Sequence, residues 1–391
     1  MEFGLGCNYW ASHAGIYMWR NWDKAVVESD LQKLSQCGIK VLRVFPLWSD
    51  FQPLTYVKGN GYYEIRNGDI ALDRSTPEGL AGVDPVMIQR FEEFVLLAKQ
   101  YDMQLIVPLI TGWMSGRMFF PSAFESRNPI SDYETIKWEL RFVRYFVERF
   151  KGFDNIAAWE AGNETNVMSF ADEGWKQGNY YVWLSNIAGA IRSADPSRPV
   201  IAGIHGLSIE GNLGITIAEV GEVCDVLTVH PYAPFVPHCY VDGYTTMRSK
   251  LHATTESILY SQISGKPCLC EEIGHLGNSL GCDETVAKYL RANLYIVCRR
   301  IACTGHIACN PQGYGHIYPL ALQRIELFLS KTNLQAPAVK HIHIGTSLSR
   351  NQLYIVECVS SILTCRRIFL KLIKGNSAHK GTVFTVIGVH T

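Results

Sequence analysis

Short apolar runs alternate with longer amphipathic stretches through the first 330 residues of the chain. The short runs are rich in β-branched residues, which favours strands, and the stretches between them repeat apolar positions at helical spacing. This alternation predicts parallel strands joined by helices. The predicted strands span residues 3–9, 40–45, 104–110, 156–160, 200–204, 226–230, 267–271 and 306–310, and predicted helices include 22–37, 85–101, 131–150, 175–193, 247–264 and 283–299.

Eight strand–helix units over some 330 residues predict a (β/α)8 TIM barrel with insertions, a fold that typically takes about 250 residues. An open doubly wound sheet is the alternative. It would normally carry a glycine-rich phosphate turn after the first strand, whereas this chain reads Asn8-Tyr9-Trp10-Ala11-Ser12 there. The longest predicted loops, 46–84, 111–130, 165–174 and 231–246, all follow strands, which is the end of a barrel that holds an active site.

The composition indicates a globular protein, because 47% of the 391 residues are hydrophobic and 12% are aromatic. The 36 Lys and Arg balance 36 Asp and Glu, so we expect neither a nucleic acid nor an anionic membrane as partner. No apolar window is long enough to predict a membrane span, and the first residues lack the features of a signal peptide. The 12 Cys include no C-x-x-C pair, so we expect free thiols and a cytoplasmic location, or secretion if a leader has been trimmed.

The charge is distributed unevenly along the chain. From Arg291 onward there are 12 Lys and Arg but only two acids, and all nine Trp lie between Trp10 and Trp183. We expect a barrel domain over 1–335 and, because the tail is rich in Val, Ile, Thr and Leu, a small β-rich segment over 336–391. The alternative is that part of this tail is a misread or frameshifted sequence.

Polar side chains follow five of the predicted strands. Because the carboxyl ends of barrel strands meet on one face, we expect these side chains to converge there. The candidates are Arg43, Asn163, Glu164, His205, His230, Tyr232, Glu271 and Glu272.

Two acids facing each other suit cleavage of a glycosidic bond. One must be protonated to assist the leaving oxygen, and the other must be ionised to attack or to activate water. We expect Arg43 to hold one carboxylate ionised and Tyr232 to hydrogen-bond it. The other carboxyl, in a more apolar setting near Trp159, is expected to have a raised pKa. For a single Glu at a strand end, an ordinary ion pair is the alternative.

Several runs of the sequence resemble motifs of clan A glycoside hydrolases, and the set is most similar to glycoside hydrolase family 5. The opening run, together with Phe45-Pro46-Leu47-Trp48, is similar to the β-mannosidase and β-mannanase branches of that family. The resemblance covers about residues 1–330. The runs are Gly6-Cys7-Asn8-Tyr9-Trp10, Leu42-Arg43-Val44-Phe45-Pro46, Trp159-Glu160-Ala161-Gly162-Asn163-Glu164, His230-Pro231-Tyr232 and Cys270-Glu271-Glu272-Ile273-Gly274.

The resemblance implies a retaining β-glycoside hydrolase that acts on β-1,4-linked mannosides or mannan-type oligosaccharides, with β-1,4-glucans as the alternative substrate. Glu164 would be the acid/base, and Glu272 would be the nucleophile that forms a covalent glycosyl-enzyme. Glu271 would lie behind the site or on the opposite face, because only one of two consecutive strand residues points into the cleft.

The same resemblance assigns supporting roles. Asn163 would bind the sugar 2-hydroxyl, an interaction that strengthens in the transition state. Arg43 and Tyr232 would position Glu272, and His230 would contact the acid/base or the substrate.

Aromatic side chains bear on the substrate, because sugar rings stack their apolar faces on indoles and phenols. We expect Trp113, Trp10, Trp19 and Trp48, together with His205, to bind substrate, and Trp113 is the favoured sugar platform. Packing of a loop is the alternative for each of these Trp residues.

The sequence departs from family 5 at the predicted eighth strand. Members usually carry a Trp there, but this chain reads Ile307-Ala308-Cys309-Asn310. Either another residue supplies the platform, or the sequence is altered here, or the enzyme is impaired. The change of composition nearby favours the second explanation.

Three rival functions follow from other features. Gly277-Asn278-Ser279-Leu280-Gly281 fits the esterase nucleophile elbow but does not directly follow a strand. Cys268-x-Cys270 and His341-x-His343 lack a second pair at ligand spacing, so we expect no metal and no cofactor. A non-catalytic carbohydrate-binding barrel would have no reason to keep both Glu164 and Glu272.

Overall fold

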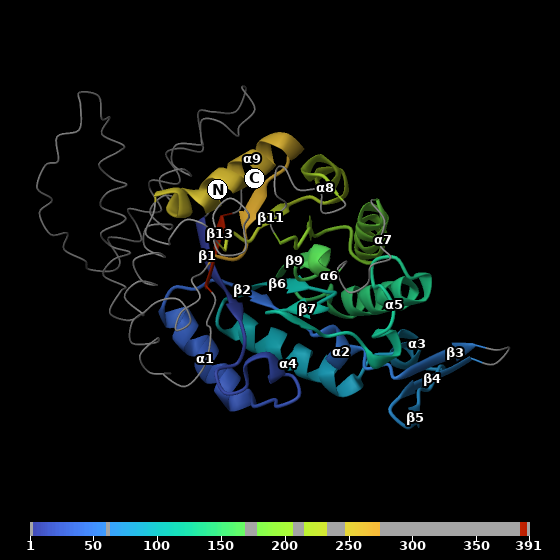
Figure 1. The fold of residues 1–391 in the computed structure, drawn as a ribbon. Helices are drawn as coiled ribbons and strands as arrows, with labels where there is room; N and C mark the ends of the chain where they lie inside the picture. Colours follow the sequence, from blue (N-terminus) through green and yellow to red (C-terminus); the bar gives the residue numbers. More distant parts are fainter. Residues whose placement is uncertain are drawn as a thin grey trace, which may run out of the picture.

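The computed structural model describes residues 3–59, 63–168, 178–205, 215–232, 247–273 and 384–388. Its centre is a sheet in the order β10-β9-β6-β2-β1-β13 (Figure 1). All neighbours in this sheet are parallel except β13, which runs antiparallel to β1. The strands are β1 (Phe3–Tyr9), β2 (Val41–Val44), β6 (Gln104–Pro108), β9 (Ile156–Glu160), β10 (Val200–Ile201) and β13 (Phe384–Gly388).

A second parallel pair, β11 (Leu227–Val229) and β12 (Cys268–Cys270), continues the sheet in chain order. A bridge between Ile201 and Val226 links this pair to β10. Seven parallel strands therefore follow one another as the first seven predicted strands do, and the architecture is a (β/α)8 barrel, as predicted. The predicted eighth strand at 306–310 lies outside the described residues.

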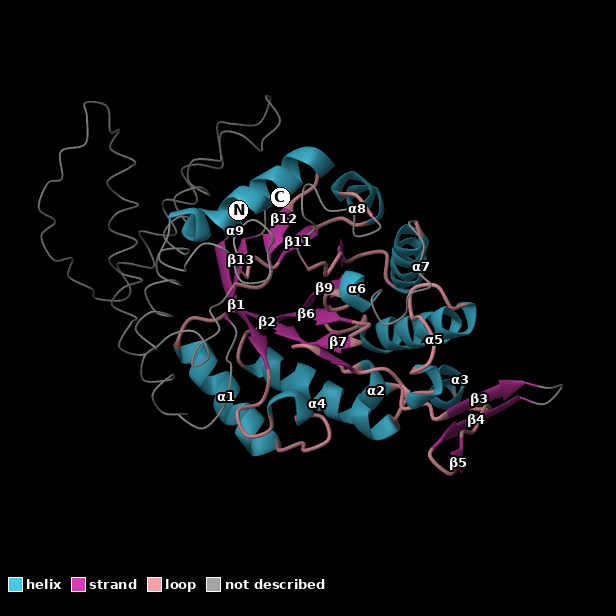
Figure 2. Cartoon of the chain, in the orientation of Figure 1, coloured by secondary structure: helices cyan, strands magenta, loops and turns pink. Residues whose placement is uncertain are grey.

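Helices cover the outer side of the strands (Figure 2). Several begin where the sequence places a capping acid: the side chains of Asp23, Asp84 and Asp132 accept hydrogen bonds from the first turns of α1, α4 and α5. The covering helices are α1 (Lys24–Gln36), α4 (Pro85–Gln100), α5 (Tyr133–Phe150), α7 (Asn179–Ala194), α8 (Ile217–Val223) and α9 (Met247–Ser264). The α8 helix lies between the fifth and sixth predicted strands, outside the predicted helix ranges, and the predicted helix at 283–299 lies outside the described residues.

The long loops after the strands carry small elements of their own. The loop after β2 forms a three-stranded antiparallel sheet that projects from one edge of the barrel (Figure 1). The loop after β6 forms a short hairpin, and a one-turn helix follows β9. These elements are η1 (Gly15–Tyr17), α2 (Trp48–Phe51), β3 (Tyr56–Gly59), β4 (Tyr63–Asn67), β5 (Ile70–Ala71), α3 (Pro77–Ala81), β7 (Trp113–Met114), β8 (Arg117–Met118), η2 (Ser122–Phe124) and α6 (Thr165–Met168).

Aromatic side chains fill the layer between the strands and the helices. Phe91 of α4 contacts Phe146 and Phe150 of α5, with ring centroids 4.8 and 4.9 Å apart. Phe146 in turn meets Trp159 of β9 edge to face. This apolar layer packs against the back of β9, the strand that leads to Asn163 and Glu164. None of the described helices has the length and apolar character that crossing a bilayer requires.

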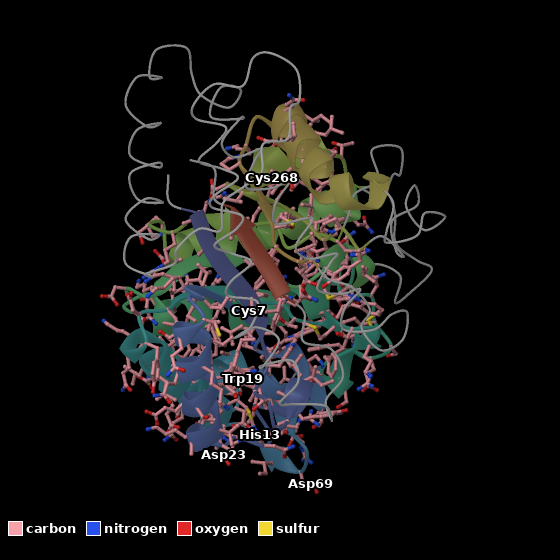
Figure 3. The ribbon with its side chains drawn as sticks, turned by 90° about the vertical axis from the view of Figure 1, so that its left-hand side faces the viewer. Cys7, His13, Trp19, Asp23, Asp69 and Cys268 are labelled. Atoms are coloured by element: carbon pink, nitrogen blue, oxygen red, sulfur yellow. The ribbon has the colours of Figure 1, made fainter. Side chains whose placement is uncertain are left out.

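Strand β13 is the part of the predicted segment 336–391 that the structure describes. It pairs with β1 from Phe3↔Gly388 to Cys7↔Phe384, and the two strands run side by side near Cys7 (Figure 3). It also contacts β12. The barrel seam between β12 and β1 is therefore occupied by a strand from the end of the chain, while the division into two domains stays a prediction.

Candidate active site

Arg43 lies at the centre of the site and is fully buried on β2. Its Nη1 lies 2.5 Å from Glu272 Oε1, its Nε donates to Glu160 Oε2 at 2.8 Å, and its Nη2 donates to Asn163 Oδ1 at 2.9 Å. The rigid fork of a guanidinium suits this task, because its five N–H groups can serve several acceptors in one plane. Arg43 thus ties the ends of β2, β9 and β12 together.

Glu272 follows β12 and is held from two sides. Besides the bond from Arg43, the Tyr232 hydroxyl donates to its Oε2 at 2.9 Å. Burial beside the Glu272 carboxylate raises the pKa of Tyr232 well above its usual range, so this hydroxyl keeps its proton and stays a donor. The contacts match the arrangement that the sequence predicts for Arg43, Tyr232 and Glu272.

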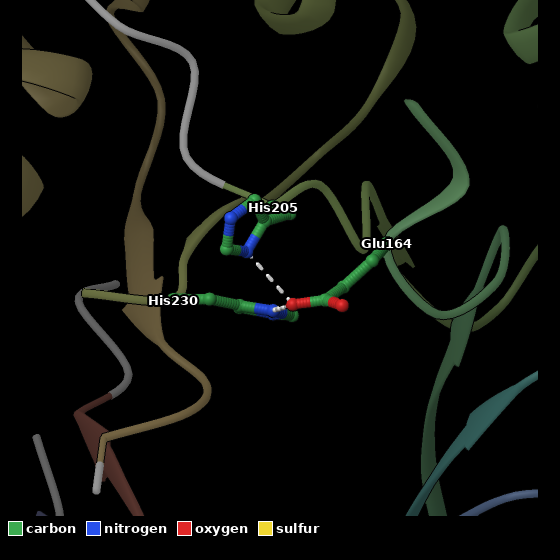
Figure 4. A group of neighbouring side chains, drawn as sticks. All are labelled: Glu164, His205 and His230. Atoms are coloured by element: carbon green, nitrogen blue, oxygen red, sulfur yellow. Dashed lines mark hydrogen bonds and ion pairs between the residues drawn. The ribbon is translucent and has the colours of Figure 1, made fainter. Parts of the chain in front are cut away.

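Glu164 follows β9, and two histidines approach the same carboxylate oxygen (Figure 4). His205 Nδ1 lies 2.8 Å and His230 Nδ1 lies 2.9 Å from Glu164 Oε1. The other oxygen, Oε2, accepts a hydrogen bond of 2.9 Å from the indole of Trp113. Glu164 also adopts a left-handed backbone with φ of 47°, which is rare for a residue other than glycine and clusters at functional sites.

The expected electrostatics of Glu164 need a correction. Burial alone would raise the pKa of this carboxyl, but the hydrogen bonds from His205 and His230 and the proximity of their rings outweigh burial and lower the pKa. Trp159 does not provide an apolar setting for Glu164, since it is buried in the core and donates to Asp195. In the free protein Glu164 is therefore ionised.

Of the two places predicted for Glu271, the structure has it behind the site and not on the opposite face of the strand. Its Oε2 lies 3.1 Å from His230 Nε2, and its Oε1 lies 3.3 Å from Arg43 Nε. The alternation argument fails because β12 ends at Cys270, so Glu271 and Glu272 are no longer in a regular strand. Burial alone would lower the pKa of His230, but the carboxylates of Glu272, Glu164 and Glu271 raise it to about 10. His230 is therefore a cation that bridges Glu164 and Glu271.

Two glycines allow the end of β9 to approach the ends of β6 and β10 closely. A Cβ on Gly203, whose φ is 63°, would collide with the carbonyl oxygen of Gly162 and with the Glu160 carboxylate. A Cβ on Gly162 would collide with the carbonyl oxygen of Ile110. Only glycine fits both positions, and this close packing brings His205 beside Glu164.

The predicted tryptophan platforms divide into two groups. Trp19 and Trp48 are fully buried; Trp19 donates to the Phe45 carbonyl and Trp48 donates to Gln52, so the expectation that they stack on sugar was wrong. These indoles belong to the core because the loops that carry them fold back onto the helices. Trp113 and Trp10 are half-buried; Trp113 bonds Glu164, and Trp10 stacks on Phe45 at 5.1 Å.

Sequence reasoning missed two residues that organise the site. Glu160, fully buried, is the bidentate partner of Arg43. Asn166 holds the backbone of His205 by accepting from its N–H at 3.0 Å and donating to its carbonyl at 2.8 Å. A buried strand that ends in Glu, and Asn two residues after the acid/base candidate, are the only sequence signals for these roles.

The two candidate catalytic carboxylates lie close together. His230 Nδ1 is 2.9 Å from Glu164 Oε1 and 3.8 Å from Glu272 Oε1, so these oxygens are within about 7 Å of each other. Carboxyls about 5–5.5 Å apart are typical of retaining glycosidases, and a larger separation is typical of inverting ones. A (β/α)8 barrel with two such glutamates at its strand ends defines a site of the glycoside hydrolase class.

Residues 10–307 match the family described as Cellulase (glycosyl hydrolase family 5). The chain belongs to glycosyl hydrolase family 5.

Curated relatives are mannan endo-1,4-beta-mannosidases. The chain is 24% identical over 284 residues to mannan endo-1,4-beta-mannosidase F of Aspergillus clavatus, covering 67% of this chain and 61% of that protein. It is 24% identical over 288 residues to mannan endo-1,4-beta-mannosidase A of Hypocrea jecorina, covering 69% and 59%. The matched region thus spans about three fifths of the length of these relatives.

Solved structures share the fold. The exo-beta-1,4-mannosidase Op5Man5 from Opitutaceae bacterium strain TAV5 is 22% identical with a TM-score of 0.61, covering 76% of this chain and 50% of that one. A GH5_18 protein from Streptomyces cattleya in complex with Manb1-4GlcNAc is 17% identical with a TM-score of 0.64, covering 96% and 92%.

Proposed function

We propose that this protein is a retaining β-glycoside hydrolase that cleaves β-1,4-linked mannosyl substrates. The observation that carries the proposal is the opposed pair of carboxylates: Glu272 held by Arg43 and Tyr232, and Glu164 held by two histidines. A carboxylate fixed by cationic and phenolic donors suits a nucleophile. A carboxyl that exchanges hydrogen bonds with imidazoles suits a group that must gain and lose a proton.

In the first step Glu272 attacks the anomeric carbon, and the glycosidic oxygen leaves with a proton from Glu164. Because Glu164 is ionised in the free protein, the proton must arrive when substrate binds. A bound sugar excludes water from Glu164, which favours its neutral form, and the protonated Nδ1 of His230, 2.9 Å from Glu164 Oε1, is the proton donor in contact with it. In the second step Glu164 takes a proton from the water that hydrolyses the glycosyl-enzyme.

Asn163 supplies contact with the sugar. Its Nδ2 donates to the Trp113 carbonyl at 2.9 Å, which uses one of its two amide hydrogens. We assign the second hydrogen to the sugar 2-hydroxyl, where a bond strengthens as the oxocarbenium-like transition state forms. Arg43 fixes the amide orientation by donating to Asn163 Oδ1.

The choice of mannosyl substrates is supported by the names of the relatives and of the structural neighbours. The family description, Cellulase, makes β-1,4-glucan the alternative. Mannose and glucose differ in the orientation of the 2-hydroxyl, so discrimination between them depends on the surroundings of Asn163.

The test compares the wild type, Glu272→Gln and the exposed control Glu125→Gln on aryl β-mannoside, aryl β-glucoside, mannan and a soluble cellulose derivative. We expect turnover of mannosyl substrates by the wild type and the control, and a loss of at least about a thousandfold in Glu272→Gln. NMR of the first-formed product is expected to show the β-anomer. Turnover confined to glucosides would favour the glucanase, and a folded wild type without any turnover would favour a binding protein.

A further inference from the structure

Glu164, His205 and His230 come from the ends of three different strands and meet at one point (Figure 4). One ligand-type atom from each side chain lies within 4.8 Å of the other two. In the described part of the chain, no other group of three His, Cys, Asp or Glu residues is so arranged. Two imidazole nitrogens and one carboxylate oxygen form the ligand set that zinc uses in many proteins.

The spacing of these atoms is close to what a metal ion requires. Tetrahedral Zn²⁺ binds nitrogen and oxygen at about 2.0–2.2 Å, which separates neighbouring ligand atoms by roughly 3.3 Å. Here both Nδ1 atoms lie 2.8–2.9 Å from Glu164 Oε1. For an ion to replace the shared protons, Glu164 Oε1 would move about half an ångström from each Nδ1, and the two Nδ1 atoms, which lie within 4.8 Å of each other, would adjust to the same spacing.

Neighbouring groups orient two of the three ligands, His230 and Glu164. The Nε2 of His230 faces Glu271 Oε2 at 3.1 Å, which leaves Nδ1 as its metal-facing atom. Trp113 donates to Glu164 Oε2 and so directs Oε1 toward the histidines. Pairs of a carboxylate and a histidine behind the metal are the arrangement that raises ligand basicity and fixes the imidazole in metalloproteins.

The position is reachable, and binding of a metal ion there would displace the proton of the His230 imidazolium rather than a lysine or arginine. The side chains of His205 and Glu164 are 20% and 12% exposed. The ion pairs of Arg43 are with Glu160, Glu271 and Glu272, and among the described residues no Lys or Arg pairs with Glu164.

We propose that Glu164, His205 and His230 form a three-ligand site for a divalent transition metal of the Zn²⁺ type, with solvent in the fourth position. Binding there occupies the carboxylate that serves as acid/base. The ion is therefore a reversible inhibitor that competes with substrate, and this second part rests on the proposed function.

The binding test uses Zn²⁺ alone, in equilibrium dialysis of the full chain with wild type, His205→Ala, Glu164→Gln and the exposed control His13→Ala. We expect affinity for one ion to fall at least about tenfold in the two site variants and to stay unchanged in the control. Co²⁺ spectra distinguish the site from cysteine thiols, because nitrogen and oxygen ligands give visible bands without a thiolate charge-transfer band. Thermal melting without metal shows that each variant is folded.

The activity test adds Zn²⁺ to the wild type at several substrate concentrations. Inhibition that weakens as substrate rises and is reversed by a chelator supports the proposal. Equal Zn²⁺ binding by wild type and His205→Ala, or a thiolate spectrum, would overturn it even if the enzyme hydrolyses mannosides. If the wild type has no glycosidase activity but the site variants lose Zn²⁺ binding, the proposed function is rejected and the metal site is supported.

Discussion

The carboxylate of Glu164 is positioned by its neighbours more than by its own side-chain preferences. Its backbone lies in the left-handed region, and three donors surround its two oxygens. A residue other than glycine in this region costs of order 1 kcal/mol, so the surrounding contacts must maintain it. A small change in any of these partners is therefore expected to alter the position or the pKa of the Glu164 carboxylate.

The proposed role of Glu164 as acid/base predicts a dependence on the leaving group. We expect Glu164→Gln to lower kcat/KM for mannan by about 10²–10⁴, because the leaving oxygen loses its proton donor. With a dinitrophenyl mannoside, which departs without protonation, the first step is expected to proceed and a glycosyl-enzyme to accumulate. The measurement is burst kinetics, with azide added as a small nucleophile. Equal losses for both substrates would argue against this role.

The two groups of tryptophans predict opposite responses. Trp48→Phe leaves Gln52 Oε1 without the indole donor in the core, so we expect unfolding free energy to fall by about 1–3 kcal/mol with KM unchanged. Trp113→Phe removes a donor from Glu164, so kcat is expected to fall about tenfold with little change in stability. Urea unfolding and steady-state kinetics of both variants check this. A raised KM in Trp48→Phe would restore it as a substrate-binding residue.

At the scale of elements, Asp195 fastens the turn between α7 and β10 to β9. The Trp159 indole donates to its Oδ2 at 2.9 Å, and Ser197 and Arg198 bond the same carboxylate. Burial opposes ionisation, but these hydrogen bonds outweigh it and lower the pKa of Asp195. This turn fixes the position of β10 along β9, and thus the position of His205, which follows β10.

The lowered pKa of Asp195 predicts an acid-sensitive contribution to stability. The contribution is complete above the unfolded-state pKa of about 3.9 and is lost as the pH falls from there through the folded-state pKa. We expect Asp195→Asn to lower unfolding free energy at pH 7 by about 1–3 kcal/mol and to flatten the pH dependence below about 4. Thermal melts between pH 2.5 and 7, in steps of about half a unit, measure both effects. If the melting temperature of the variant fell with pH as steeply as that of the wild type, Asp195 would not be the source of the acid sensitivity.

Most of the strands, and the polar residues at their ends, could be predicted from the sequence because both are local patterns. Arg43, Asn163, Glu164, His230, Tyr232 and Glu272 follow from position at strand ends and from the family motifs. The burial of Trp19 and Trp48 depends on how loops fold back, which periodicity does not encode. The low pKa of Glu164 depends on two histidines that lie 41 and 66 residues further along the chain.

For the molecule as a whole, β13 determines how the sheet ends. It pairs with β1 from Phe3 to Cys7 and contacts β12, so this part of β1 is not an exposed edge. Unpaired strand edges are open to pairing with other chains. The last residues of the sequence thus protect the first strand.

This pairing predicts the effect of a truncation after residue 383. Without β13, the N–H and C=O groups of β1 that face it lose their partners. We expect a lower melting temperature, faster amide exchange in Phe3–Tyr9, and more aggregation at high protein concentration. Hydrogen exchange followed by mass spectrometry measures the second effect. Unchanged exchange in β1 would rule out the pairing.

The contacts of Arg43 have a consequence for the stage of folding at which activity appears. Its partners Glu160 and Glu272 lie 117 and 229 residues away along the chain. Contacts across such separations form late, because long loops must close first. A nascent chain that has not yet reached Glu272 lacks the proposed nucleophile and leaves the Arg43 guanidinium without one of its carboxylate partners. In a refolding experiment, the recovery of activity therefore reports when β12 docks. We expect this recovery to begin only after spectroscopic signals of helix and sheet formation have appeared.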